Sequence, residues 1–313
     1  GAAAERLRHF SDQDFLDLQV CFLLAWTGEA ARRRFPVCSQ LIDKDQGYTE
    51  AERDALVAVH QAILKDIVPL YRRLYQQGSI ELTVSPYYHP ILPLLCDTNT
   101  ARTAMPDASL PKEPLRAPED ARAQVLQGIQ YFTSVFGSPP RGMWPSEGSV
   151  SDEVLEILQQ CGIQWVATDE EILAKSLGDG LSGPSRSSLY HCWRYKDHEA
   201  GLGMLFRDHQ LSDLIGFTYS AWDARRAVAD FLGRLHHLSQ AGARTISVIL
   251  DGENAWEFYE NNGYDFLRLL YQSLVADARF TMQTGTDVFR HDTGEHRLWH
   301  IHPGSWINGT YGI

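Results

Sequence analysis

Residues 245–253, TISVILDGE, place an acid and a glycine directly after a run rich in β-branched and apolar residues. Such a run favours a β-strand, and the abrupt change at Asp251-Gly252 marks its end. The same pattern, a short apolar stretch that stops at polar or aromatic side chains, recurs along the chain. We therefore expect four further strands of this kind: 80–84, 142–144, 163–167 and 202–206.

Helical patterns alternate with these strands. Capping signals mark several helix starts, as at Ser11, Thr49 and Ser151, and Gly78 and Gly137 end two helices. We expect helices over residues 12–34, 50–77, 118–136, 152–161, 223–241 and 264–274. Short strands that alternate with longer helices are typical of a parallel sheet covered by helices, so the sequence predicts an α/β fold.

The side chains that follow the strands include residue types common in catalysis. In chain order they are His89, Glu147, Asp169, His209 and Asp251. The carboxyl ends of parallel strands share one face in barrels and doubly wound sheets, and active sites lie on that face. Each residue alone is better explained as a helix cap or a turn residue. All five together favour a functional face.

Two of these residues suggest glycoside chemistry. Asp251 follows the apolar run without a polar buffer, so we expect a partly desolvated acid at the lip of a buried strand, which suits a general acid. Glu147 sits between a strand and a helix start, where a carboxylate is held rigidly. A pair of carboxylates on one face can cleave a glycosidic bond. The alternatives are an Asp251 that accepts backbone hydrogen bonds and a Glu147 that stabilises a helix start.

Aromatic and histidine side chains accompany the two acids. Trp144, Tyr88 and Trp256 lie outside the expected helices and could stack on sugar rings. His89, His209 and an aspartate could ligate a divalent metal. Neither His89 nor His209 belongs to an HxxxH or HxH pair, however, so we expect no metal and assign the two histidines to hydrogen bonds with sugar hydroxyls or the nucleophile.

Composition narrows the class of partner. The 313 residues carry a net charge of −12 without a long charge run, which disfavours nucleic acid and anionic membranes. No apolar run is long enough to span a bilayer, and no signal peptide is evident. The five cysteines lack CxxC spacing, which favours reduced thiols in a cytoplasm. No Walker loop and no GxSxG occurs, and the glycine-rich stretch that begins Gly178-Asp179-Gly180 is interpreted as a plain loop, so we expect no cofactor and no serine hydrolase.

Several long segments, in order, resemble glycoside hydrolase family 57 and within it the amylopullulanase and α-amylase-like branch. They are FSDQDFLDLQVCFLLAW (10–26), IELTVSPYYHPILPLL (80–95), GMWPSEGSVSDEVLEIL (142–158), FRDHQLSDLIGF (206–217), VILDGEN (248–254) and HPGSWIN (302–308). The resemblance runs almost from end to end. It implies a (β/α)7 barrel, a distorted relative of the eight-fold barrel, with helical insertions.

The resemblance also implies a retaining mechanism. Glu147 matches the family's nucleophile and Asp251 its acid/base residue. The positions matching the sugar subsite next to the cleaved bond, and the further substrate contacts expected from their place in the matched segments, are His89, Trp144, His209, Asp213, Tyr88, Trp256 and Trp306.

One conserved feature of the family is missing from the sequence: the His-Gln-Pro motif of its first strand. We therefore expect residues 1–313 to be a single catalytic barrel domain that is truncated at both ends. Residues 11–78 would pack on the barrel as a helical segment. Weak or no activity is expected of this piece alone.

The expected function is a retaining hydrolase of α-glucans such as starch, glycogen or maltooligosaccharides, acting on α-1,4 bonds, with α-1,6 bonds left open. A 4-α-glucanotransferase on the same substrates is the nearest alternative. A metal-dependent carbohydrate deacetylase and a non-catalytic glycan-binding protein are the others. The oligomeric state stays open.

Overall fold

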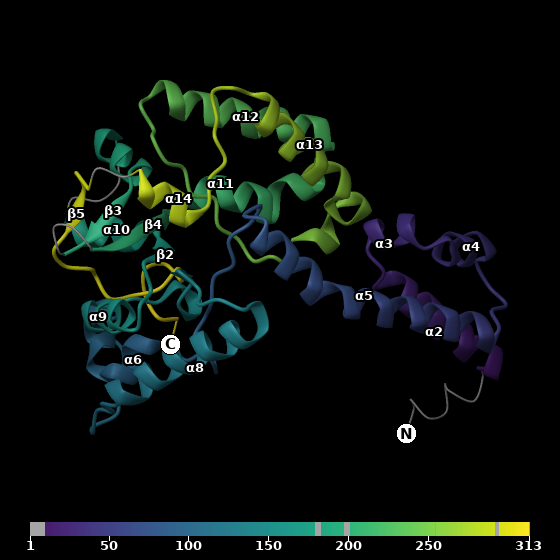
Figure 1. Cartoon of the computed structure of the whole chain (residues 1–313), viewed down its shortest axis with the longest axis horizontal. Helices are drawn as coiled ribbons and strands as arrows, with labels where there is room; N and C mark the ends of the chain where they lie inside the picture. The colour runs from purple at the N-terminus through teal and green to yellow at the C-terminus, as the bar shows by residue number, and fades with distance from the viewer. Residues whose placement is uncertain (1–9, 179–182, 197–200, 254, 292–293, 313) are drawn as a thin grey trace.

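A computed structural model describes residues 10–178, 183–196, 201–253, 255–291 and 294–312. Figure 1 shows a body in which helices cover a central sheet, and a helical arm that projects from it. The α/β class expected from the sequence is confirmed.

Within these described ranges, the sheet has five strands in the order β1-β2-β4-β3-β5. They are β1 (Gly142–Met143), β2 (Trp165–Asp169), β3 (Trp193–Tyr195), β4 (Leu202–Arg207) and β5 (Arg297–Leu298). The strands β1, β2 and β4 run parallel, with Met143 beside Val166 and Val166 beside Met204. The strand β3 is antiparallel to β4. The parallel centre brings the carboxyl ends of β1, β2 and β4 to one edge, as predicted.

The two outer segments, 80–84 and 245–250, differ from the prediction. Each makes a single bridge, Val84 to Met143 and Ser247 to Arg207, and neither forms a regular strand. Side chains take the place of a ladder in the second segment: the Ile249 amide donates to the Ser212 hydroxyl (3.1 Å), and the Ile249 carbonyl accepts from Arg207 (2.8 Å). The strand assignment there was wrong because side chains occupy these backbone groups.

Helices cover both sides of the sheet (Figure 1). On one side lie α6 (Leu92–Cys96), α8 (Pro118–Phe136) and α9 (Asp152–Gln160), and on the other α12 (Ala224–Gln240) and α13 (Tyr264–Ala276). Shorter helices connect them: α7 (Ala101–Ala104), α10 (Glu170–Leu177), α11 (His209–Asp213) and α14 (Gly285–Arg290). One apolar core lies around the strands with α8 and α9, and a second lies between α12 and α13.

The arm contains α2 (Asp12–Ala25), α3 (Glu29–Arg34), α4 (Pro36–Lys44) and α5 (Glu50–Gln76). The predicted capping box at Thr49 is confirmed at the start of α5. The single helix expected over 12–34 is wrong: the Thr27 hydroxyl donates to the Leu23 carbonyl (2.8 Å), and Gly28 is extended, so the chain breaks between α2 and α3.

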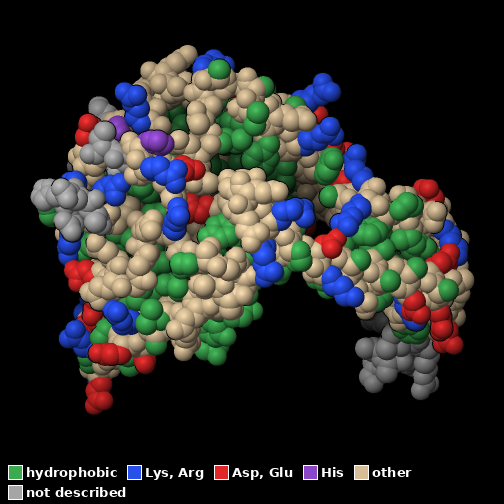
Figure 2. Space-filling view, viewed as in Figure 1, with side chains coloured by type: hydrophobic (Ala, Val, Ile, Leu, Met, Phe, Trp, Pro, Cys, Tyr) green, Lys and Arg blue, Asp and Glu red, His purple; other side chains and the backbone are tan. Residues whose placement is uncertain are grey.

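Hydrophobic side chains gather on the face of the arm seen in Figure 2. No helix in the described part of the chain is both long and apolar enough to cross a bilayer.

Candidate active site

Glu147 lies in a strained turn just after β1. It has φ 54° and ψ 26°, in the left-handed region that non-glycine residues rarely adopt. Its carbonyl accepts the backbone N–H of Trp306 (3.0 Å). The next residue, Gly148, has φ +60°, and a Cβ there would lie 2.8 Å from the Trp144 ring. A strained residue that its surroundings hold in place costs about 1–3 kcal/mol and is common at active sites.

Two side chains hold the Glu147 carboxylate. The indole N–H of Trp306 donates to Oε2 (2.8 Å), and Nε2 of His89 lies 3.3 Å from Oε1. His89 is itself left-handed, with φ 57°. Each carboxylate oxygen therefore has its own partner, and the Glu147 side chain stays 37% exposed. The structure thus fixes the orientation of Glu147 while leaving it accessible.

Trp306 and Trp144 form an aromatic wall beside Glu147. Their rings meet edge to face, with centroids 5.2 Å apart. Both line a cavity of about 520 Å³, a size typical of small-molecule sites. Asp251 lines the same cavity. Glu147 does not line this cavity itself, but Trp306, which binds its carboxylate, does. Trp306 therefore connects Glu147 with the space that Asp251 lines.

The setting of Asp251 differs from the expectation. Asp251 is exposed, and residues 245–250 are half-buried. These residues line the cavity instead of lying beneath a covering layer. The predicted desolvated acid at the lip of a buried strand was therefore wrong, although Asp251 does lie at the edge of the cavity.

Arg207, at the end of β4, is a buried cation beneath the aromatic wall. Its guanidinium lies over the Trp306 ring, 5.6 Å from the centroid. It donates to Asp213 and to the Ile249 carbonyl, and one of its nitrogens lies 3.9 Å from Asp169. This role was not predicted, although a basic residue among strand-end acids was a signal for it.

His209 pairs with a carboxylate beneath the site instead of with Glu147. Its Nε2 lies 2.5 Å from Oδ2 of Asp169, which is fully buried. Its backbone N–H donates to Glu170 (2.9 Å). The hydrogen bond with Asp169 raises the pKa of His209. The pairing with Asp169 therefore favours the protonated form of the His209 imidazole, next to the Arg207 cluster.

Tyr88 and Trp256 lie farther out than the other predicted residues. Tyr88 is 76% exposed and packs edge to face on Tyr87, with centroids 4.8 Å apart. The indole N–H of Trp256 donates to the Gly252 carbonyl (2.7 Å), next to Asp251. Trp256 thus borders the Asp251 loop, while Tyr88 presents an exposed ring on the segment that carries His89.

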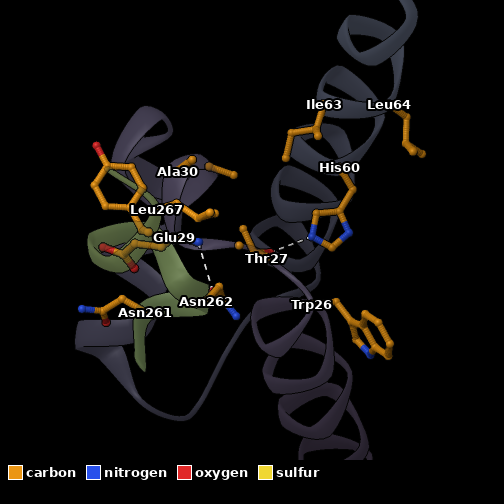
Figure 3. Close-up of a pocket in the computed structure, with 13 residues that line it drawn as sticks. Trp26, Thr27, Glu29, Ala30, His60, Ile63, Leu64, Asn261, Asn262 and Leu267 are labelled. Atoms are coloured by element: carbon orange, nitrogen blue, oxygen red, sulfur yellow. Dashed lines mark hydrogen bonds between the residues drawn. The ribbon is translucent and has the colours of Figure 1, made fainter. Parts of the chain in front are cut away.

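A second cavity of about 520 Å³ lies between the arm and the start of α13. Figure 3 shows His60 and Ile63 of α5 facing Ala30 and Leu267 across it. Among the described residues that line it, Glu29 alone carries a carboxylate, and Glu29 is paired with Arg33 (2.7 Å). This cavity therefore lacks a pair of acids. Across the described part of the chain, no group of three or more metal-ligating side chains converges.

The chain was compared with known proteins. It is 23% identical over 231 residues to an α-amylase of Pyrococcus furiosus, covering 71% of this chain and 29% of that protein. It is 24% identical over 222 residues to a 4-α-glucanotransferase of Thermococcus kodakarensis, covering 68% and 28%. The chain thus spans under a third of the length of these relatives.

A solved structure shows the fold. The α-amylase AmyC of Thermotoga maritima matches with a TM-score of 0.62 and 14% identity, over 94% of this chain and 64% of that one. The TIM-like barrel fold expected from the sequence is confirmed, although no bridge joins the two outer segments among the described residues. The amylopullulanase branch stays a prediction. Because the model of glycosyl hydrolase family 57 matches residues 3–301, the chain belongs to that family.

Proposed function

We propose that the protein cleaves α-glucans with retention of configuration, with Glu147 as nucleophile and Asp251 as acid/base. The observation that carries the proposal is Glu147 itself. It is held in a strained turn by Trp306 and His89, and Trp306 lines the same cavity as Asp251. Family membership supports the same chemistry.

In the first step, a Glu147 oxygen attacks the anomeric carbon while Asp251 gives its proton to the leaving glycosidic oxygen. This forms a glycosyl ester on Glu147 and releases the rest of the chain. In the second step, Asp251 removes a proton from water, and the resulting attack frees the sugar and Glu147. A retaining pair of this kind works with carboxyl groups about 5–5.5 Å apart.

The surrounding side chains would bind the sugar. Trp144 and Trp306 offer an aromatic wall against the apolar face of a ring. We assign His89, His209 and Asp213 to the subsite at the cleaved bond. Tyr88 and Trp256 are assigned to sugars farther along the chain.

Glucan transfer is the second candidate, because a sugar hydroxyl can replace water in the second step. Relatives of this chain carry the names α-amylase and 4-α-glucanotransferase. Product analysis with maltooligosaccharides separates the two: hydrolysis releases reducing ends, whereas transfer gives longer chains at a constant number of reducing ends.

We take residues 1–313 as one catalytic domain, with the arm as part of it. We also place the protein in the cytoplasm, in keeping with five cysteines that are present as thiols.

Azide rescue of two variants tests the roles. In Glu147→Ala, azide can attack the substrate directly, so an activated α-glycoside should yield the β-glycosyl azide. In Asp251→Ala, azide should attack the ester on Glu147 and yield the α-glycosyl azide. Glu156→Gln, on the exposed side of α9, is the control and should hydrolyse substrate like the unchanged protein.

Other outcomes would overturn the proposal. Full hydrolysis by Glu147→Ala would show that Glu147 is not the nucleophile. Binding of maltooligosaccharide without turnover would favour a non-catalytic glycan-binding protein. Deacetylation that stops with a chelator but survives Glu147→Gln would favour the metal-dependent alternative.

A further inference from the structure

We propose that Arg207 is a positioning residue for the nucleophile, and that it acts through Trp306. The inference rests on the proposed function, because it assigns a role in forming the glycosyl ester on Glu147. Arg207 itself has no described contact with Glu147; the indole ring of Trp306 lies between them.

The first link is the contact between cation and ring. The guanidinium carbon of Arg207 lies 5.6 Å from the centre of the Trp306 ring, within the range of a cation–π interaction. A positive charge over the ring face draws electron density toward it. The indole N–H at the ring edge then becomes a stronger hydrogen-bond donor.

The second link is the hydrogen bond from that N–H. It points at Oε2 of Glu147 over 2.8 Å. The backbone of Trp306 also binds the Glu147 carbonyl (3.0 Å). Trp306 thus holds both ends of the nucleophile, so any change in the position or polarity of its ring reaches the attacking carboxylate.

The third link is the set of contacts that holds Arg207 in place. The residue is only 7% exposed. Its donors are directed to Asp213 and the Ile249 carbonyl, and Asp169 lies within 3.9 Å. Ile249 lies two residues before Asp251. One side chain therefore supports the nucleophile through Trp306 and the segment that carries the acid/base residue.

A purely structural role is the competing explanation, since Arg207 also neutralises buried charge. A double-mutant cycle separates the two roles. The four proteins are the unchanged protein, Arg207→Met, Trp306→Phe and the double variant. The phenylalanine ring keeps a surface for the cation but has no N–H. The readout is the rate constant and the affinity for covalent inactivation by an activated fluoroglycoside that accumulates as the glycosyl ester.

We expect Arg207→Met to slow inactivation about 3- to 30-fold, the range of a cation–π contact that is partly to fully desolvated, with unchanged affinity. In the Trp306→Phe background the same substitution should have no further effect. Arg194→Met is the matched control, because Arg194 also lies over an aromatic ring, Phe289, at 5.5 Å. It should inactivate at the normal rate.

Arg207→Lys covers the case in which the methionine variant fails to fold, because it keeps a positive charge beside Asp169 and Asp213. Its smaller loss of rate should likewise vanish in the Trp306→Phe background. Equal losses in both backgrounds would overturn the inference and leave Arg207 a structural residue. If the unchanged protein is never labelled on Glu147, the proposed function itself fails. The two failures are therefore distinguishable.

Discussion

Replacing Gly148 by alanine should damage the active site more than its small size suggests. Gly148 follows Glu147 directly and has φ +60°. A new Cβ would lie 2.8, 3.1 and 3.4 Å from three atoms of the Trp144 ring. The ring is wedged against Trp306, so it cannot yield without disturbing the residue that holds Glu147.

The loss of stability expected for Gly148→Ala has two parts. A non-glycine residue in the left-handed region costs about 1–2 kcal/mol. Forcing an atom into packed surroundings adds about 1–3 kcal/mol. Gly162→Ala isolates the first part, because Gly162 has φ +88° and nothing within 4 Å of a new Cβ. We expect Gly162→Ala to lose about 1–2 kcal/mol of unfolding free energy and Gly148→Ala about 2–5 kcal/mol.

Thermal or denaturant unfolding of both variants measures the difference, and hydrolysis of a maltooligosaccharide measures the effect on the site. Gly148→Ala should lower kcat/KM at least about tenfold, the equivalent of 1.4 kcal/mol at the transition state, while Gly162→Ala should leave it unchanged. Equal stability losses and equal activities in the two variants would refute the reasoning, because Trp144 would then not be wedged against Gly148.

Three further predictions follow from the same contacts. Trp306→Phe removes one hydrogen-bond donor to the half-exposed Glu147 carboxylate. The value of kcat/KM should therefore fall about 10- to 30-fold, which is the lower part of the range for hydrogen bonds to charged groups, with little change in Tm. An unchanged kcat/KM would contradict this. The pairing with Asp169 raises the pKa of His209, so its stabilising contribution is complete below the ordinary value of 6.5 and disappears as pH rises through the raised value. The difference in Tm between the unchanged protein and His209→Gln should therefore shrink at alkaline pH, and a constant difference would count against the ion pair. Thr49→Ala removes the cap of α5 and should cost the arm about 1 kcal/mol, seen as faster hydrogen exchange in the arm, whereas uniform exchange across the chain would argue against a local effect.

The sequence predicted those features that local patterns determine. Strands β2 and β4 and the helix start at Thr49 depend on residue type and spacing within a few positions. The position of Glu147 after β1 also follows from a strand that ends in a turn. These features need no knowledge of distant contacts.

The features that the sequence analysis missed depend on contacts between distant segments. Ile249 lacks a strand ladder because Arg207 and Ser212, far away in the chain, bind its backbone. Asp251 is exposed because its segment lines the cavity, which no local pattern can reveal. Arg207 was given no role because its contact with Trp306 joins segments that are far apart in the chain.

The role of Glu147 is tested most directly by trapping the glycosyl ester with an activated fluoroglycoside and locating it by peptide mass spectrometry. The account predicts one added glycosyl group, on the peptide that contains Glu147, and none in Glu147→Gln. A glycosyl group on any other residue, or turnover of α-glucan with inversion of configuration, would contradict it.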